Sequence, residues 1–84
     1  MDSKQRIVYE ARARIVKALA HPARLLIVDE LNKGPLCVCD IREMVGSDIS
    51  TVSKHLSVLK NVGIVTDEKR GSQVFYSLRC SCVT

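Results

Sequence analysis

The 84-residue sequence predicts one mainly α-helical domain that carries a small β-hairpin near its carboxyl end. Two observations lead to this fold class. Over residues 3–62 apolar side chains recur at three- and four-residue spacing, which is the period of one helical face. After Gly63 the spacing changes, and β-branched and aromatic residues surround a glycine-containing turn, as is typical of a hairpin. A domain of this size buries only about 60 to 65% of its unfolded surface, so a partner subunit would add stability.

The composition is that of a globular protein, with 46% hydrophobic and 26% charged residues. No apolar run approaches the roughly 18 residues that span a bilayer. The first residues, MDSKQRIVYEARARIVK, are charged throughout and resemble neither a signal peptide nor an anchor, so we expect a cytoplasmic protein without a membrane partner. Thirteen Lys and Arg against nine Asp and Glu give a net charge of +4, which permits nucleic-acid binding without proving it.

Two helices are expected in the first part of the chain. Asp2 or Ser3 can cap the first, which runs to about Leu19 and carries an apolar stripe broad enough to include a subunit interface. The His21-Pro22 pair separates it from a second helix that runs to about Asn32, because Pro suits the first position of a helix. His21 is interpreted as structural. The core candidates of the second helix are Leu25, Leu26, Val28 and Leu31.

A short helix and a longer one follow. Residues 35–38 are expected to be extended, and Asp40 can cap a third helix over residues 41–45 that ends at Gly46. A tight turn at residues 46–48 then leads into a helix within residues 47–62. A short helix, a turn and a second helix are typical of the helix-turn-helix, whose second member enters the major groove of DNA.

The helix within residues 47–62 has two different faces. Val52, Leu56, Leu59 and, more peripherally, Val62 share one face that should be buried. The opposite face and its flanks are polar and contain no carboxylate, which suits an anionic partner, although any amphipathic helix of a globular domain has a polar face. The residues of this helix predicted to contact DNA are Ser50, Thr51, Ser53, Lys54, His55, Ser57 and Lys60.

The hairpin is expected to comprise strands at residues 64–68 and 73–78, joined by a turn at residues 69–72. Its tip places basic side chains beside the helix-turn-helix, as in a winged helix, where the tip reaches phosphate or the minor groove. The alternative is an ordinary solvated turn. The predicted DNA contacts at the tip are Lys69, Arg70, Ser72 and Gln73.

Four cysteines form the pairs Cys37/Cys39 and Cys80/Cys82. Without an export signal, reduced thiols are favoured over disulfides, and the pairing points to metal, metalloid or redox chemistry. Side chains at i and i+2 of an extended strand share a face, so Cys37 and Cys39 should converge ahead of the third helix. The helix dipole there would favour thiolate over thiol.

With these residues in view, the chain resembles the ArsR/SmtB family of winged-helix metalloregulatory repressors over essentially its whole length. The matching stretches are KALAHPARLLIVDEL, LCVCDI, STVSKHLSVLKNVGIV and RGSQVFYSL. The resemblance implies a homodimer that binds a palindromic operator in double-stranded DNA. It also implies repression of metal- or metalloid-resistance genes, and release when an inducer binds. The LCVCDI stretch resembles the thiolate site of the arsenic and cadmium/lead branches, which implies Cys37 and Cys39 as inducer ligands.

The sequence departs from those branches. Arg42 stands where the arsenic type has a third cysteine, and the cysteine-bearing extension of the cadmium/lead type is absent. We hypothesise that Cys80 and Cys82 complete the site, since the strand at residues 36–38 should lie beside the second hairpin strand. Three thiolates suit As(III), and four suit Cd²⁺, Pb²⁺ or Zn²⁺. Alternatively, Cys37 or Cys80 is simply a small buried side chain.

The chain is expected to be a single domain over residues 1–84, stopping before the final dimerisation helix of the family. No obligatory cofactor is expected. Two other functions stay open, namely a repressor of the same fold that responds to thiol oxidation, and a small thiolate metal-binding module that does not bind DNA. An enzyme is not indicated, because no nucleophile grouping, glycine-rich phosphate loop or Cys-x-x-Cys motif is present.

Overall fold

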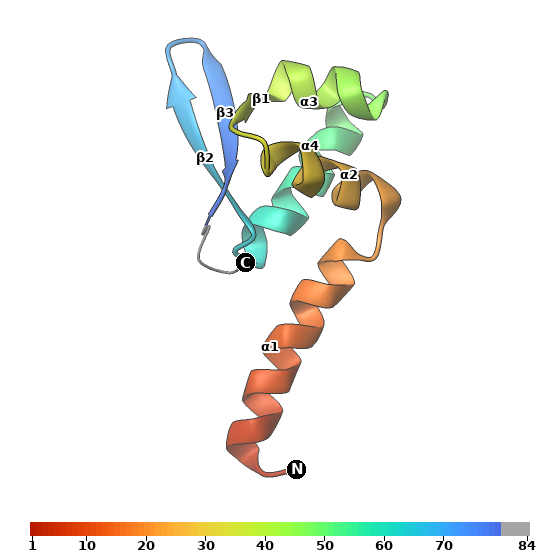
Figure 1. Ribbon diagram of the computed structural model, residues 1–84, viewed down its shortest axis with the longest axis vertical. Helices are drawn as coiled ribbons and strands as arrows, with labels where there is room; N and C mark the ends of the chain where they lie inside the picture. Colours follow the sequence, from red (N-terminus) through yellow and green to blue (C-terminus); the bar gives the residue numbers. More distant parts are fainter. Residues whose placement is uncertain (80–84) are drawn as a thin grey trace.

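The computed structural model describes residues 1–79, which form four helices and a three-stranded sheet. The elements are α1 (Ser3–Leu19), α2 (Pro22–Leu31), β1 (Leu36–Cys37), α3 (Val38–Val45), α4 (Ile49–Asn61), β2 (Val65–Arg70) and β3 (Gln73–Leu78). The sheet is antiparallel in the order β1-β3-β2 and lies beside a body made of α2, α3 and α4, while α1 projects away from that body (Figure 1). This arrangement confirms the predicted winged helix-turn-helix. Within the described residues no helix is long and apolar enough to cross a membrane.

The first two helices begin where the sequence predicts. Asp2 caps α1, since its carboxylate accepts a hydrogen bond from the Gln5 amide at 2.8 Å and the Gln5 side chain accepts one from the Asp2 amide in return. His21 caps α2, because its Nδ1 accepts a hydrogen bond from the Ala23 amide at 3.1 Å. The structural interpretation of His21 is therefore confirmed.

The start of the third helix differs from the prediction. α3 begins at Val38, with Cys37 in the N-cap position, so the proposed Asp40 cap is wrong. The strand before it is only two residues long, with Leu36 opposite Tyr76 and Cys37 opposite Phe75, and the chain turns into a helix at once. Asp40 lies in the first turn of α3, where a carboxylate interacts favourably with the helix dipole. Gly46 ends α3 in the left-handed conformation, as expected.

One hydrophobic core joins α2, α3, α4 and β2. The fully or nearly fully buried members are Ile27, Leu31, Ile41, Val52, Leu56, Leu59 and Val65. The apolar face predicted for α4 is confirmed, with Val62 half-buried at its edge. In α2 the prediction was partly wrong, because Leu25 and Leu26 are 50% and 38% exposed. Ile27 takes their place, since it shares a helical face with Leu31.

The hairpin turn is shorter than predicted. Lys69 and Arg70 belong to β2 and not to the turn, because Arg70 is paired with Gln73 across the ladder. The turn consists of Gly71 and Ser72 alone. Gly71 has a φ of +63°, which a two-residue hairpin turn requires at its first position and which glycine adopts without strain.

His55 is the main departure in α4. It was expected on the polar flank, but it is 7% exposed and packs against α2. Arg24 Nε donates a hydrogen bond to His55 Nδ1 at 3.1 Å, and the rings of His21 and His55 lie 4.5 Å apart. Burial lowers the pKa of His55, and the charges of His21, Arg24 and Lys54 lower it further. His55 is therefore a neutral packing residue and not an exposed DNA contact.

Matched leucine substitutions test the position of the core. Leu59→Ala should lower the free energy of unfolding by about 2 to 5 kcal/mol, because Leu59 is fully buried. Leu25→Ala, the same change at a half-exposed position, should cost less than about 1 kcal/mol. Urea denaturation measures both, and equal losses would contradict the packing described.

His55 should make stability depend on pH. Because its pKa in the folded protein is below the ordinary value of 6.5, the folded state binds fewer protons than the unfolded chain. The His55 contribution is therefore complete above about pH 6.5 and is lost as the pH falls below it. We expect the urea midpoint to drop between pH 7.5 and pH 5.5, and to drop less in His55→Gln. An unchanged pH dependence in that variant would exclude this role.

Candidate nucleic-acid interface

The outward face of α4 is the central part of the candidate interface. Ser50, Thr51, Ser53, Lys54 and Ser57 are all exposed, and the helix itself contains no acidic residue. Its amino end is fixed by Asp48, whose carboxylate accepts a hydrogen bond from the Thr51 amide at 2.8 Å. That backbone hydrogen bond, with a further one from the Thr51 side chain, lowers the pKa of Asp48. Hydroxyl and ammonium donors on a fixed helix suit both phosphates and base edges.

Two of the predicted DNA-contacting cations already have acidic partners. Lys60 Nζ lies 2.9 Å from an Asp67 carboxylate oxygen, and this hydrogen bond raises the pKa of Lys60. Arg70 Nε lies 2.8 Å from a Glu68 oxygen, and its guanidinium stacks over the ring of Phe75. Both side chains remain exposed, but their charges are partly compensated.

The tip of the hairpin is exposed at each of the predicted positions. Lys69, Ser72 and Gln73 are all exposed, and Gln73 lies directly opposite Arg70. Among the residues that the structure describes, the ion pairs are Lys33–Glu30, Lys60–Asp67 and Arg70–Glu68, so Lys54 and Lys69 are not neutralised in this way. Uncompensated positive charge thus lies on α4 and near the hairpin tip.

Cys37 and Cys39 do not converge as predicted. Since α3 begins at Val38, the two side chains do not follow the alternation of a strand. Cys37 is buried, and Cys39 is exposed in the first turn of α3. The backbone amide of Asp40 lowers the pKa of Cys37, but the Asp40 side chain, burial and the nearby charges outweigh it, so the net pKa is raised. Without a bound ion, the balance therefore favours the thiol form of Cys37.

The described residues alone do not form a closed metal site. Within residues 1–79 no three His, Cys, Asp or Glu side chains are grouped closely enough to hold an ion. Cys80 and Cys82 lie outside the described residues. β1 pairs with β3, as expected, and Cys37 lies opposite Phe75. From Phe75, β3 continues for three positions to its last residue, Leu78, which is about 10 Å further along the strand.

Sequence reasoning missed three residues that shape this surface. Arg24 bridges α2 and α4 through His55, and only the folded structure brings these residues together. Asp67 reaches Lys60 from β2, which is again a tertiary contact. The pair of Glu68 and Arg70 was detectable, because side chains at i and i+2 of a strand share a face.

Comparison with known proteins was made at the level of sequence and of structure. Residues 21–67 match the model of the bacterial regulatory protein, arsR family. The chain is 44% identical over 66 residues to the HTH-type transcriptional regulator NmtR of Mycobacterium tuberculosis. The aligned region covers 79% of this chain and 55% of that protein. It is 43% identical over 67 residues to a cadmium resistance transcriptional regulatory protein CadC homolog of Staphylococcus aureus, with the same two coverages. The chain thus spans about half the length of these curated relatives.

Among solved structures, a homodimeric winged helix-turn-helix DNA-binding domain from Mycobacterium bovis, a possible ArsR-family regulator, superimposes with a TM-score of 0.90. It is 30% identical, and the match covers 99% of this chain and 77% of that one. These relatives are regulators and not enzymes, in agreement with the sequence. The matched region takes in α2, α3, α4 and the start of β2, and on this evidence the chain belongs to the arsR family of bacterial regulatory proteins.

Proposed function

We propose that this chain is a homodimeric transcriptional repressor that binds a palindromic operator through α4 and is released by an inducer that reacts with cysteine thiols. The observation that carries the proposal is the acid-free, exposed face of α4, which the core holds outward. An α-helix fits the major groove, where hydroxyl, amide and ammonium donors meet base edges and phosphates. The exposed hairpin tip would contact the adjacent backbone.

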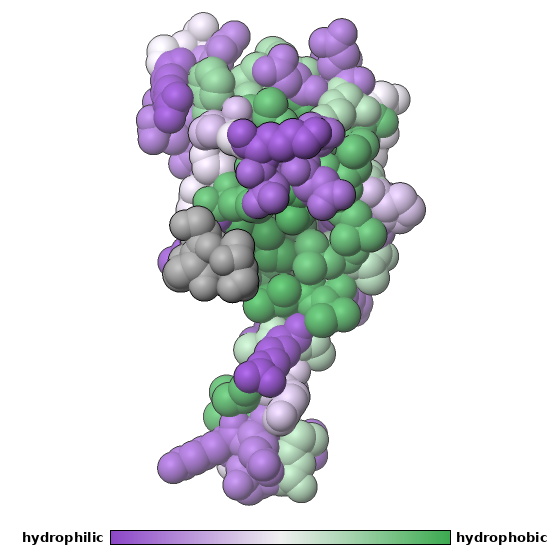
Figure 2. Space-filling model, in the orientation of Figure 1, coloured by the Kyte–Doolittle hydropathy of each residue, from purple (hydrophilic) through white to green (hydrophobic). Residues whose placement is uncertain are grey.

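Dimerisation through α1 is supported by its exposed apolar side chains. Ile7 and Val16 are 68% and 66% exposed, and Ala18 is the buried residue of the helix. Figure 2 shows continuous apolar surface on the body, close to the carboxyl end of α1. In this region Ile15, Leu19 and Leu78 help to line a groove. The Mycobacterium bovis neighbour is a homodimer. Two copies of α4 would then meet half-sites about one duplex turn apart.

We propose that the inducer is As(III) or a soft divalent metal such as Cd²⁺, Pb²⁺ or Zn²⁺, and that Cys37, Cys39, Cys80 and Cys82 supply its thiolates. The cadmium-resistance function of one relative supports a soft metal. Cys37 stands at the N-cap of α3, and α3 contributes Ile41 to the core that holds α4. Drawing Cys37 and Cys39 onto one ion would disturb the first turn of α3, and with it the position of α4.

The required coupling is modest. About a hundredfold loss of operator affinity corresponds to about 2.7 kcal/mol. Because α3 has only eight residues, its stability depends on packing and not on its own helix propensity. We therefore expect a change at its amino end to be transmitted through Ile41 to α4. We propose that the protein acts in the cytoplasm.

Two lysines of α4 provide a matched test of DNA binding. Lys54→Ala should weaken binding to all duplex sequences alike and reduce the slope of log affinity against log salt by about 1. Lys60→Ala should have a smaller effect, because Asp67 already compensates that ammonium group. Fluorescence anisotropy with a labelled duplex measures both. Parent-like binding and salt slope in Lys54→Ala would show that α4 does not contact DNA.

Cys39 provides the test of induction with the least structural disturbance, since its side chain is exposed. Cys39→Ser should retain operator binding and lose most of the release caused by arsenite or Cd²⁺. The double variant Cys80→Ser, Cys82→Ser shows whether the second cysteine pair also binds the inducer. Release of the labelled operator is measured with reduced protein. Full release from Cys39→Ser would remove Cys39 from the inducer site.

A further inference from the structure

A depression lies between the amino end of α2 and the amino half of α4, next to the exposed face of α4. Its polar lining comes from both helices and the turn between α3 and α4, and no carboxylate lines it. Thr51 and Lys54 belong both to this depression and to the exposed face of α4. The lining residues with side chains that can donate to an anion are His21, Arg24, Ser47, Thr51 and Lys54, and the buried His55 packs beneath them.

We propose that this depression binds one phosphate group of the DNA backbone, with Arg24 and Lys54 as the cations. The assignment rests on the proposed DNA-binding function and adds a contact from α2, an element outside the helix-turn-helix and the hairpin. The chemistry recognised is a tetrahedral phosphate oxyanion. A phosphate at the rim of the major groove that holds α4 would lie beside this depression.

Arg24 is held in position for this role. Its Nε donates to His55 Nδ1 at 3.1 Å, and one terminal nitrogen lies 3.4 Å from the Ala18 carbonyl oxygen. A guanidinium has five N–H donors, so these two contacts leave others available for an anion. Arg24 forms no ion pair with any carboxylate in the described part of the chain. A partly buried and tethered cation loses little freedom when it binds phosphate.

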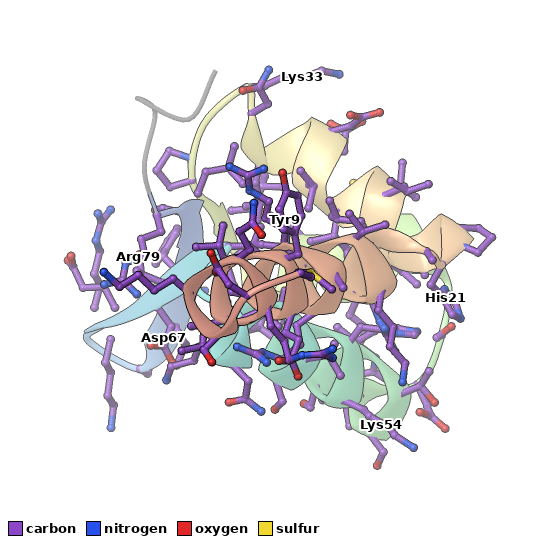
Figure 3. All side chains as sticks on the ribbon, turned by 90° about the horizontal axis from the view of Figure 1, so that it is seen from below. Tyr9, His21, Lys33, Lys54, Asp67 and Arg79 are labelled. Atoms are coloured by element: carbon purple, nitrogen blue, oxygen red, sulfur yellow. The ribbon has the colours of Figure 1, made fainter. Side chains whose placement is uncertain are left out.

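The buried His55 positions Arg24 and does not itself contact the anion. Its Nδ1 accepts the hydrogen bond from Arg24 Nε, which fixes the guanidinium beside α4. His21 stacks against His55, and Figure 3 shows His21 and Lys54 at the same end of the molecule. Asp48 lies next to the lining residue Ser47 but is not itself part of the lining. Its carboxylate accepts a hydrogen bond from the Thr51 amide.

The experiment compares Arg24→Gln with Lys33→Gln, which removes one charge at a position outside the depression. Arg24→Gln should lower the slope of log affinity against log salt by about 1 and weaken duplex binding about 5- to 10-fold at 0.1 M salt. The ratio of operator to non-operator affinity should not change. Lys33→Gln should match the parent. Arg24→Lys, which keeps the charge, should retain the slope. If Arg24→Gln does not fold, the titration of the parent protein with inorganic phosphate is the test.

A titration with inorganic phosphate, followed by the amide NMR signals, separates this proposal from the proposed function. Saturable shifts confined to residues around Ala23, Arg24 and Thr51 are expected, and they should be absent in Arg24→Gln. If the parent binds duplex DNA while Arg24→Gln keeps its affinity and salt slope, the phosphate contact is wrong and the DNA-binding function stands. Phosphate shifts without any change in the salt slope would indicate a site for free phosphate and overturn the assignment to the DNA backbone. A parent protein that binds no duplex overturns both.

Discussion

The burial of one face of α4 determines the orientation of the whole candidate interface. Val52, Leu56 and Leu59 pack against α2, α3 and β2, and burying three aliphatic side chains contributes several kcal/mol. A helix fixed on that face cannot rotate without exposing the core. The hydroxyl and ammonium groups of the opposite face are therefore held toward solvent, where a duplex can meet them.

Ion pairs reduce the positive charge in part of the candidate interface. Asp67 compensates Lys60, and Glu68 compensates Arg70, so the carboxyl end of α4 and part of the hairpin carry less net positive charge than the sequence suggests. Lys54 and Arg24 lack such partners in the described residues, and both line the depression between α2 and the amino half of α4. Positive charge without an acidic partner therefore remains at the junction of α2 and α4, where a phosphate can meet it.

Three of the four helices, the glycine that ends α3 and the apolar face of α4 were predictable because they depend on local patterns. Capping residues, glycine positions and three- to four-residue spacing predict α1, α2 and α4 to within one or two residues. What was missed depends on tertiary contacts. The burial of His55 follows from the approach of α2, and the early start of α3 follows from a strand of only two residues. The cysteine geometry was wrong for the same reason, since a helix replaced the expected strand at Val38.

Mapping the contact surface with a short duplex tests the account most directly. Amide NMR signals of the protein, followed as DNA is added, should shift most along the exposed face of α4, from Ser50 to Ser57, and at the hairpin tip around Gly71. Signals in the projecting part of α1 should shift least. The largest changes on α1, with α4 unaffected at saturating duplex, would contradict the assignment of α4 as the element that binds DNA.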